Sequence, residues 1–420
     1  MQSKLITLYE DSTSYLSDHE EYINDLLGLR DIVGRNNFIL QSDGSFRIMH
    51  YVGFYQSGKT RVQILPKIQR LGSEDEGQKS LDFIYRLLKW TDFLKYKKLD
   101  AQFLSASNTD LLEIFINLFI TNFIDLFQRR TFKKYETQID NLQFIKGKIH
   151  FSDTIRTNPI LRHRHVVSFD EYSINNPLNQ IFKTLSLQLL RKTNSPENKK
   201  LLVIGLSFLE EVNTIVLSPQ VFKTVRFDRL NSEYLPIFNI AKLFFHKGQP
   251  GLSEGKDKTL SFLVPLNSLF EEFVFKVIRS FSTKELQYNY HSPEAWLAKE
   301  GNQNRFLLKP DFTITHMGDV VTILDAKYKC PFNESGIVDI SEKDLYQLTT
   351  YAFRYNCRKL FLIYPAFQGF DNSKSLIAEY TINSVIGNVT LDIVQLDIAK
   401  KDLTQIVESV RGIFANLHSV

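Results

Sequence analysis

The chain has 420 residues, 43% hydrophobic and 23% charged, with a formal net charge of +4 at pH 7. This length is typical of two or three domains, and the composition is that of an ordinary globular protein. Because the net charge is small, contact with nucleic acid would have to come from local basic patches. The two cysteines, Cys330 and Cys357, lack metal-ligand spacing, so we expect a reducing cytoplasm with neither disulfide nor zinc. We find no signal peptide and expect no apolar run long enough to span a bilayer.

The first patterned stretch is Gly53–Thr60, whose letters match the phosphate-binding loop G-x-x-x-x-G-K-T. Such a loop needs a helix after it, because the helix N-terminus binds the phosphates. Here residues 61–67 alternate as a strand does and contain Pro66. A strand is also expected before the match, at Phe46–Val52. We therefore predict a β-hairpin at this place, with a nucleotide site as the weaker alternative.

The middle of the chain combines a core helix with a basic stretch. Leu111–Phe127 carries apolar residues at helical spacing and predicts a buried helix. Residues 129–165 hold nine Lys or Arg against three acidic residues. This stretch could lie along DNA or against an acidic partner surface, or it could be a solvated loop and strand surface. Further on, Asn176 precedes Pro177 at a predicted helix start, where it is suited to capping.

A glycine-rich loop at residues 248–255 predicts a domain boundary, and a helix is expected soon after it. In Asn267–Phe281 the apolar residues form one stripe at helical spacing, with Asn267 as the expected N-cap. Glu271 borders this stripe and can reach a core site, whereas Glu272 points nearly opposite. The alternative is that Glu271 is only a boundary residue.

Two adjacent strands are predicted next, at Arg305–Thr315 and Val320–Leu324. Because side chains alternate along a strand, Asp325 and Lys327 point to the same face, where Asp311 can meet them. Two carboxylates and an ammonium at the end of a buried strand are costly unless a cation and an anion satisfy them. Magnesium and a phosphodiester would do both. The alternative is a surface hairpin with a salt bridge.

The C-terminal elements follow in a regular order. Ser341–Asp344 predicts a helix start with a variant of the capping box, and Gln347 and Tyr351 share one face of that helix. Lys359–Pro365 is expected to be a buried strand. The last predicted elements are a strand at residues 388–397 and an amphipathic helix at residues 403–417.

Pro310-Asp311 followed by Asp325–Lys327 resembles the PD-(D/E)xK nuclease motif, with Asp as the second acidic residue. Gln347 and Tyr351 are similar to the QxxxY element of RecB-like nucleases. The resemblance implies a restriction-endonuclease-like α/β core.

It also implies a Mg²⁺ site and roles for individual residues. The implied ligands of the metal are Asp311, Asp325, the Ala326 carbonyl and Glu271. Lys327 would orient the attacking water or stabilise the charge that develops on the phosphate, and Gln347 and Tyr351 would support the site or the DNA strand.

Several further blocks resemble the McrC family, the nuclease subunits of McrBC modification-dependent restriction systems. They are Val52–Ile68, Asn141–Ile149, Asn175–Asn179 and Phe227–Asn231. The resemblance implies that residues 1 to about 250 dock onto McrB, a hexameric AAA+ GTPase, and stimulate its GTP hydrolysis. In such systems the partner binds the GTP and reads 5-methylcytosine.

The sequence therefore predicts a multidomain α+β or α/β protein. Its expected parts are a β-rich N-terminal module at 1–80, a helical and β middle region at 81–250, and a PD-(D/E)xK endonuclease domain at 251–420. We expect a cytoplasmic, Mg²⁺-dependent endonuclease of double-stranded DNA that acts with a McrB-like partner against foreign DNA and binds no membrane. The alternatives are a stand-alone RecB-like repair nuclease and a non-catalytic scaffold that activates the GTPase.

Overall fold

A computed structural model describes residues 4–57, 60–67, 76–91, 110–246, 260–333, 335–367, 373–384, 386–398 and 402–415. Two compact units are present, one of residues 3–95 and 263–420, the other of residues 96–262 with 1–2. The mixed α/β, multidomain prediction is confirmed. The three-part division at residues 80 and 250 stays a prediction, and the expected boundary loop at 248–255 lies outside the described residues.

The N-terminal part of the first unit contains a four-stranded sheet. In the order β1-β6-β5-β10, its strands are Lys4–Tyr9, Thr60–Leu65, Tyr51–Ser57 and Leu260–Pro265. β5 and β6 are antiparallel, and their last pair is Ser57 with Thr60. The hairpin predicted at Gly53–Thr60 is therefore confirmed, because a strand follows the match where a phosphate-binding loop would continue into a helix.

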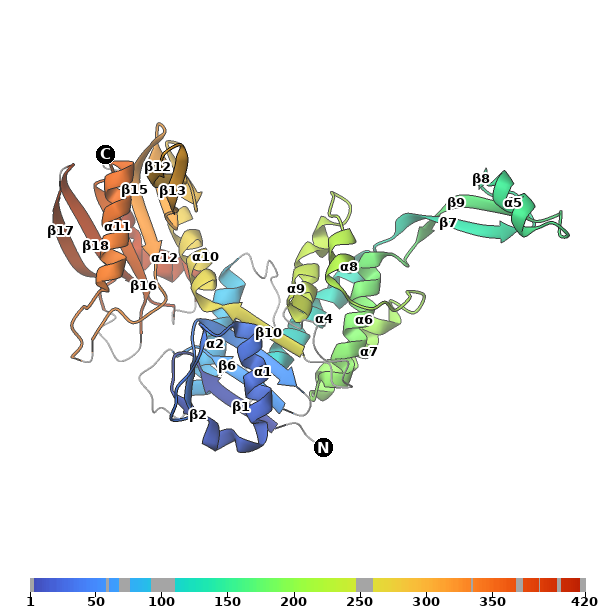
Figure 1. Ribbon diagram of the computed structural model, residues 1–420, viewed down its shortest axis with the longest axis horizontal. Coiled ribbons are helices and arrows are strands. Elements are labelled where there is room, and N and C mark those ends of the chain that lie inside the picture. Colours follow the sequence, from blue (N-terminus) through green and yellow to red (C-terminus); the bar gives the residue numbers. More distant parts are fainter. Residues whose placement is uncertain are drawn as a thin grey trace. The chain divides into compact units, whose positions relative to one another are not determined.

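A smaller three-stranded sheet and a helix pack beside these strands (Figure 1). They comprise β2 (Ser14–Tyr15), η1 (Leu16–Tyr22), α1 (Ile23–Val33), β3 (Phe38–Leu40) and β4 (Ser45–Ile48). Leu26 and Leu29 of α1 share one core with Val62 and Ile64 of β6. The single strand expected at 46–52 is wrong, because His50 has a left-handed φ of 62° that separates β4 from β5.

The C-terminal part of the same unit is built on a six-stranded mixed sheet. In the order β11-β14-β15-β16-β18-β17, its strands are Leu286–Tyr290, Phe312–His316, Asp319–Ala326, Lys359–Pro365, Gly387–Leu396 and Leu376–Ser384. β15, β16 and β18 run parallel, and the outer pairings are antiparallel. The strands predicted at 359–365 and 388–397 are confirmed, each within one residue.

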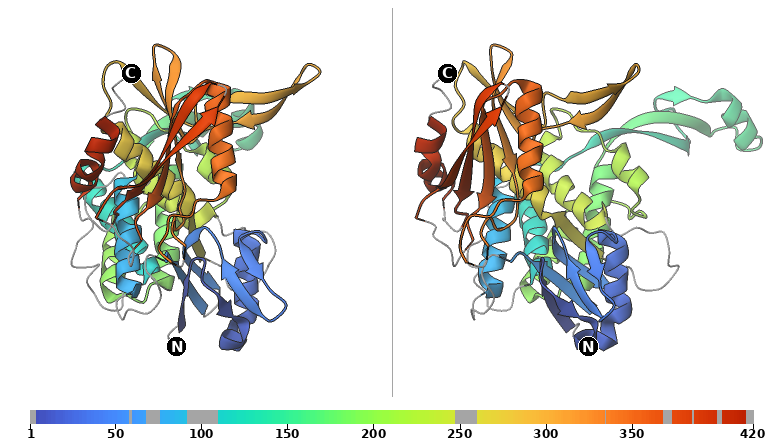
Figure 2. Two further views of the ribbon diagram at one scale, coloured as in Figure 1. Left: turned by 90° about the vertical axis from the view of Figure 1, so that its left-hand side faces the viewer. Right: turned by 60° about the vertical axis from the view of Figure 1, so that its left-hand side comes forward.

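Helices cover both faces of this sheet (Figure 2). They are α10 (Leu266–Arg279), α11 (Glu342–Tyr355) and α12 (Leu403–Ala415), and α2 (Glu76–Trp90) packs against α10. Alternate residues of β16 face opposite layers, as the two-residue period of a strand requires. Leu360 and Leu362 share a core with Leu348 of α11, whereas the ring of Phe361 lies 5.3 Å from Phe414 of α12.

Two local predictions in this part are wrong, and a third is correct only in part. Asn267 is not the N-cap of α10, because the helix begins at Leu266, whose N–H donates to the His50 carbonyl. The strand expected at Arg305–Thr315 is divided into β13 (Gln303–Leu308) and β14, because β13 pairs with β12 (Ala295–Glu300) in a separate ribbon. The predicted helix start at 341–344 is confirmed, but Ser341 makes no side-chain capping bond.

The second unit is mainly helical. Its helices are α4 (Leu111–Arg129), α6 (Pro177–Lys192), α7 (Pro196–Ser207), α8 (Pro219–Thr224) and α9 (Leu235–His246), with a short η3 at Ser232–Tyr234. The core helix predicted at 111–127 is confirmed as α4. The predicted capping of α6 is also confirmed, because the Asn176 side chain accepts from the Asn179 N–H.

α4 is the one described helix that is long and apolar enough to cross a membrane, so the expectation that no such run exists is wrong. Most of it, 83% of the apolar window, is buried within the protein. A helix that is hydrophobic all round is what a core position requires.

An arm leaves this helical unit (Figure 1). It consists of β7 (Lys134–Leu142), β9 (His165–Ser173), β8 (Lys148–Ile149) and the short helix α5 (Phe151–Thr157). β7 and β9 pair antiparallel over nine residues, from Lys134 with Ser173 to Leu142 with His165. The basic stretch at 129–165 thus lies mostly on this arm.

Candidate active site

The site begins at the C-terminal end of β15. Asp325 is 1% exposed, and its Oδ2 lies 2.6 Å from Lys327 Nζ. Asp325 and Lys327 are two residues apart and share a face, as predicted. The Asp325 Oδ1 atom accepts no hydrogen bond from any residue that the structure describes. A buried carboxylate oxygen without a donor is costly, so this atom calls for a further positive partner.

Asp311 reaches the same place from the neighbouring strand. β14 and β15 are antiparallel, with Phe312 opposite Leu324, so the start of β14 meets the end of β15. The Ala326 N–H donates to Asp311 Oδ2 at 2.9 Å, which orients the carboxylate. The structure therefore brings Asp311, Asp325 and Lys327 together.

Glu271 joins them from α10. Its side chain is 20% exposed, at the edge of the buried stripe of the helix, as the helical spacing predicts. The charges of Lys327 and Asp325 both act on this carboxyl group. Glu271 thus belongs to the same cluster and is not merely a boundary residue.

The ionisation of these groups reflects burial beside like charges. Burial, and then the neighbouring carboxylates, raises the pKa of Asp325, and burial raises the pKa of Asp311 and Glu271. Lys327 opposes each of these shifts. Burial alone would lower the pKa of Lys327, but the carboxylates of Asp325 and Asp311 outweigh it and raise the pKa. One ammonium therefore faces three carboxyl groups.

Two residues of α11 form hydrogen bonds that support the cluster. Gln347 Nε2 donates to the Tyr351 hydroxyl at 2.8 Å, so the two side chains share a face as predicted. The Tyr351 hydroxyl in turn lies 3.3 Å from the Lys309 carbonyl, to which it donates. Because Lys309 is two residues before Asp311, this chain of hydrogen bonds holds the turn that positions the carboxylate.

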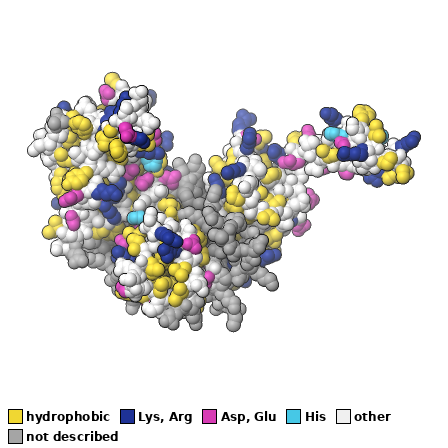
Figure 3. Space-filling view, viewed as in Figure 1, with side chains coloured by type: hydrophobic (Ala, Val, Ile, Leu, Met, Phe, Trp, Pro, Cys, Tyr) yellow, Lys and Arg dark blue, Asp and Glu magenta, His cyan; other side chains and the backbone are white. Residues whose placement is uncertain are grey.

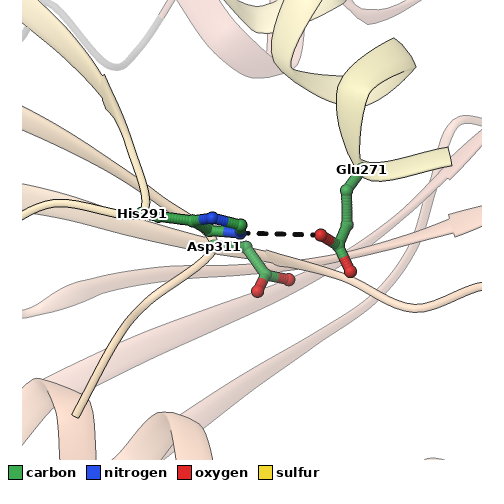
Figure 4. Close-up of side chains that lie close together, drawn as sticks. All are labelled: Glu271, His291 and Asp311. Atoms are coloured by element: carbon green, nitrogen blue, oxygen red, sulfur yellow. Dashed lines mark ion pairs between the residues drawn. The ribbon is translucent and has the colours of Figure 1, made fainter. Parts of the chain in front are cut away.

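His291 is a site residue that the sequence did not reveal. It follows β11, and its N–H donates to the Asp311 carbonyl at 2.9 Å. Its Nε2 lies 3.6 Å from Glu271 Oε2, with Asp311 alongside (Figure 4). Burial, and then Lys309, lowers the pKa of the imidazole. Nothing in the local sequence marks this residue, because only the pairing of β11 with β14 brings it to Asp311.

The donor set fits a divalent metal ion. Magnesium and manganese bind carboxylate oxygens, and three carboxyl groups converge here with one buried oxygen lacking a donor. Asp311, Asp325 and Glu271 are therefore suited to hold such an ion. The role of the Ala326 carbonyl stays a prediction.

Fold and site together define a multidomain α/β protein with a buried acidic centre at the end of a mixed sheet. A family model described as McrBC 5-methylcytosine restriction system component matches residues 46–365. That match covers well over half of the chain, so the chain belongs to this family, and the resemblance to McrC is confirmed.

Individual relatives agree. The chain is 23% identical over 279 residues to the type IV methyl-directed restriction enzyme EcoKMcrBC of Escherichia coli K12, covering 64% of this chain and 79% of that protein. It is similar to a chain in the half-complex from the tetradecameric assembly of Thermococcus gammatolerans McrB AAA+ hexamers with bound McrC, with a TM-score of 0.71, 22% identity, and 98% and 100% coverage. A second match, in the Thermococcus gammatolerans McrBC complex, has a TM-score of 0.52, 26% identity, and 67% and 89% coverage.

Proposed function

We propose that the chain is the Mg²⁺-dependent DNA endonuclease subunit of a McrBC-like restriction complex. The observation that carries the proposal is the buried cluster of Asp311, Asp325 and Lys327, in which Asp325 Oδ1 has no donor among the described residues. The order of α10, the β14–β15 hairpin, α11 and β16 is also the one expected for a PD-(D/E)xK domain. Family membership supports a role in restriction of modified DNA.

The chemistry follows from the charges of the cluster. Asp311, Asp325 and Glu271 would hold the Mg²⁺, with the Ala326 carbonyl as a further ligand. The ion would supply polarisation of the scissile phosphate and a lower pKa for a coordinated water. Lys327, already held against Asp325 at 2.6 Å, donates to the water or to the phosphate oxygens that gain charge. Gln347 and Tyr351 keep Asp311 in position through the Lys309 carbonyl.

The second part of the proposal concerns the partner. The related complexes contain McrB AAA+ hexamers, and we infer that this chain also docks on such a hexamer, which binds the GTP, and stimulates its hydrolysis in the cytoplasm. The arm supports this inference, because Phe151, Ile155 and Ile160 are 71%, 74% and 89% exposed. Figure 3 shows hydrophobic and basic side chains interspersed along it. Such a mixture is typical of a surface that a partner covers.

A cavity of about 840 Å³ at the root of the arm extends this surface. Arg130, Lys133 and Arg226 line it and form no ion pair among the described residues. The rings of Tyr135 and Tyr172 also line it, with their centroids 5.0 Å apart. Its charge favours an acidic segment of the partner.

The test is cleavage of methylated and unmethylated plasmid by the full chain, with and without its McrB-like partner, in GTP and Mg²⁺. We expect cutting of methylated DNA only when the partner is present. Asp325→Asn should lower cleavage at least about a hundredfold, since the site loses a carboxylate charge that would hold the metal ion. Asp319→Ala, at the exposed start of the same strand, is the matched control and should cut normally.

Two outcomes would contradict the proposal. Cleavage by the chain alone would favour a stand-alone repair nuclease. Normal cleavage by Asp325→Asn and by Lys327→Ala, both folded by circular dichroism, would remove this cluster as the active site.

A further inference from the structure

The ribbon of β12 and β13 is exposed on both of its faces. Every residue from 296 to 307 is exposed, and the ribbon projects from the six-stranded sheet (Figure 2). A two-stranded hairpin by itself is at best marginally stable in water. The ribbon nevertheless carries four large apolar side chains, those of Trp296, Leu297, Phe306 and Leu307. Such a patch on a projecting element indicates a surface that a ligand or partner covers.

The backbone of the ribbon is strained at one of these residues. Phe306 has a left-handed φ of 57°, which is an outlier for a bulky side chain inside a strand. The pairs on either side keep the register, for example Trp296 with Leu307, but the pair that would join Leu297 to Phe306 is missing. The ladder is therefore interrupted at an aromatic residue that is 71% exposed. Strain of this kind clusters at sites that contact a ligand.

The ribbon is fixed at its base and joined near its tip. Arg354 Nε of α11 donates to the Trp296 carbonyl at 3.0 Å, which ties the first strand to the helix. Near the tip, Arg305 Nε donates to Glu300 Oε2 at 2.7 Å and so links the two strands. Phe306 is thus presented on a positioned element before any ligand arrives.

The place of the ribbon in the fold points to DNA as its ligand. Phe306 is five residues before Asp311, so the chain between them spans at most about 18 Å. That length corresponds to about five base pairs at the rise of B-form DNA. Lys299 of the same ribbon is exposed and forms no ion pair with any residue that the structure describes, so its charge is available to a phosphate. A duplex at the acidic centre therefore lies within reach of Phe306.

From these observations we propose that Phe306 is a wedge residue, which inserts between two base pairs of the bound duplex and unstacks them within about five base pairs of the cut. The inference deepens the proposed nuclease function and rests on it for the DNA substrate. Apolar side chains inserted at a base step kink the duplex, and pyrimidine–purine steps yield most easily. The wedge therefore directs cleavage to phosphates that lie near such a step.

The experiment measures base stacking in the assembled complex. The chain carries Asp325→Asn so that the DNA stays intact, and it is mixed with its McrB-like partner, GTP, Mg²⁺ and methylated duplexes that contain 2-aminopurine at successive positions. Fluorescence of this base rises when it is unstacked. We expect a rise at one step only, and Phe306→Ala should abolish it.

Met317→Ala is the matched control and should keep the rise. Met317 is also exposed, at 92%, and also has a left-handed φ, of 51°. It lies in the turn between β14 and β15, however, at the opposite end of β14 from Asp311.

Conservative substitution separates the wedge from a merely structural role. Phe306→Leu keeps an apolar wedge and should retain most of the fluorescence rise, whereas Phe306→Ser should lose it. Both should leave the slope of log affinity against log salt unchanged, because no phosphate contact is lost. In the chain with Asp325 intact, Phe306→Ala should also lose the preference for cuts near pyrimidine–purine steps.

Three results would overturn the inference. They are a duplex that shows no rise at any position, a rise that Phe306→Ala leaves unchanged, and equal cut positions for wild type and Phe306→Ala. If Phe306→Ala instead prevents assembly with the partner or with a second copy, measured by light scattering, the surface binds protein and the wedge is rejected.

The outcomes for the inference and for the proposed function are distinguishable. A rise that depends on Phe306, with a wild-type chain that leaves the plasmid uncut, would retain the wedge and reject the nuclease. Cleavage that depends on Asp325, without a rise at any position, would retain the nuclease and reject the wedge.

Discussion

Glu10, directly after β1, is a buried carboxyl group outside the candidate active site. It is 6% exposed and accepts a hydrogen bond from the His50 N–H at 3.2 Å. Burial raises its pKa to about 7, against the lowering by that hydrogen bond. A carboxyl with a raised folded-state pKa binds more protons when folded than when unfolded. Its contribution to stability is therefore full below the unfolded value of 4.5 and is lost as the pH rises to about 7.

We predict that Glu10→Gln stabilises its unit at pH 8 by about 1–3 kcal/mol, because the amide keeps the acceptor and removes the buried charge. At pH 4.5 the gain should largely vanish. Urea unfolding followed by tryptophan fluorescence measures this, since both tryptophans, Trp90 and Trp296, belong to the unit of residues 3–95 and 263–420. A gain that is equal at both pH values would show that folding does not raise the pKa of Glu10.

Asn198, in the other unit, completes a buried polar network. Its Nδ2 donates to Glu113 Oε2 at 2.8 Å, and its Oδ1 accepts from Asn117 at 3.0 Å. Thr193 also donates to Glu113, at 2.5 Å. Such a network is stabilising only while every member is satisfied, because each orphaned group keeps its full desolvation cost.

Asn198→Ala should therefore lower the opening free energy of α4 and α7 by about 2–3 kcal/mol. Hydrogen exchange of the amides in these two helices measures the loss. Asn213→Ala, which removes an exposed side chain of the same unit, should leave exchange unchanged. Equal protection in both variants would mean that the network adds no stability.

At the scale of elements, the β12–β13 ribbon connects β11 to β14. His291 directly follows β11, and Asp311 directly precedes β14. The ribbon begins four residues after His291 and ends three residues before Asp311, so its root lies at the end of the sheet that holds the acidic centre. α11 fixes that root, since Arg354 donates to the Trp296 carbonyl and the Tyr355 hydroxyl to the Pro293 carbonyl. Phe306 and Lys299 are exposed on the ribbon. Basic and apolar side chains on a two-stranded ribbon suit a DNA groove.

We predict that the ribbon holds the DNA beside the scissile phosphate. Lys299→Ala should weaken duplex binding and reduce the slope of log affinity against log salt by about one, as for the loss of one phosphate contact. Lys284→Ala is the control, because Lys284 lies just before the start of β11, at the end away from His291. It should change neither the affinity for the duplex nor the salt slope. Fluorescence anisotropy with a labelled duplex at several salt concentrations is the measurement, and identical slopes for wild type and Lys299→Ala would exclude the contact.

At the scale of the whole molecule, the arm and the acidic centre belong to different compact units. If the arm binds the partner and the acidic centre cleaves DNA, as proposed, substitutions in one unit should impair one function and leave the other intact. Phe151→Asp with Ile155→Asp should abolish stimulation of the partner's GTP hydrolysis and therefore cleavage, because the charges oppose burial of the arm by the partner. Binding of Mg²⁺ at the acidic centre should stay normal. Asp325→Asn should do the reverse and leave the stimulation intact.

The matched control is Val216→Asp, which charges another exposed apolar residue of the same unit. Phosphate release by the partner and plasmid cleavage, measured in parallel, give both readouts. Normal stimulation by the doubly substituted arm would show that the partner contacts another surface.

Local patterns in the sequence were enough for elements whose cause is local. The alternation at residues 61–67 and Pro66 predicted a hairpin at Gly53–Thr60, and the apolar spacing of 111–127 predicted α4. The same period placed Glu271 at the edge of a buried stripe, and the two-residue spacing placed Asp325 with Lys327. These features depend on neighbours in the chain, so the sequence alone determined them.

The tertiary structure decided what depends on residues far apart in the chain. His291 meets Asp311 only because β11 pairs with β14, and α10 begins at Leu266 instead of after Asn267 because Leu266 bonds to the His50 carbonyl. The ribbon of β12 and β13 likewise exists because those strands pair with each other outside the sheet. Each of these contacts joins segments that are far apart in the chain, and no local sequence pattern predicts the contact. The reason is that a backbone N–H or carbonyl at a strand edge or a helix end can pair with any backbone group that the fold brings near it.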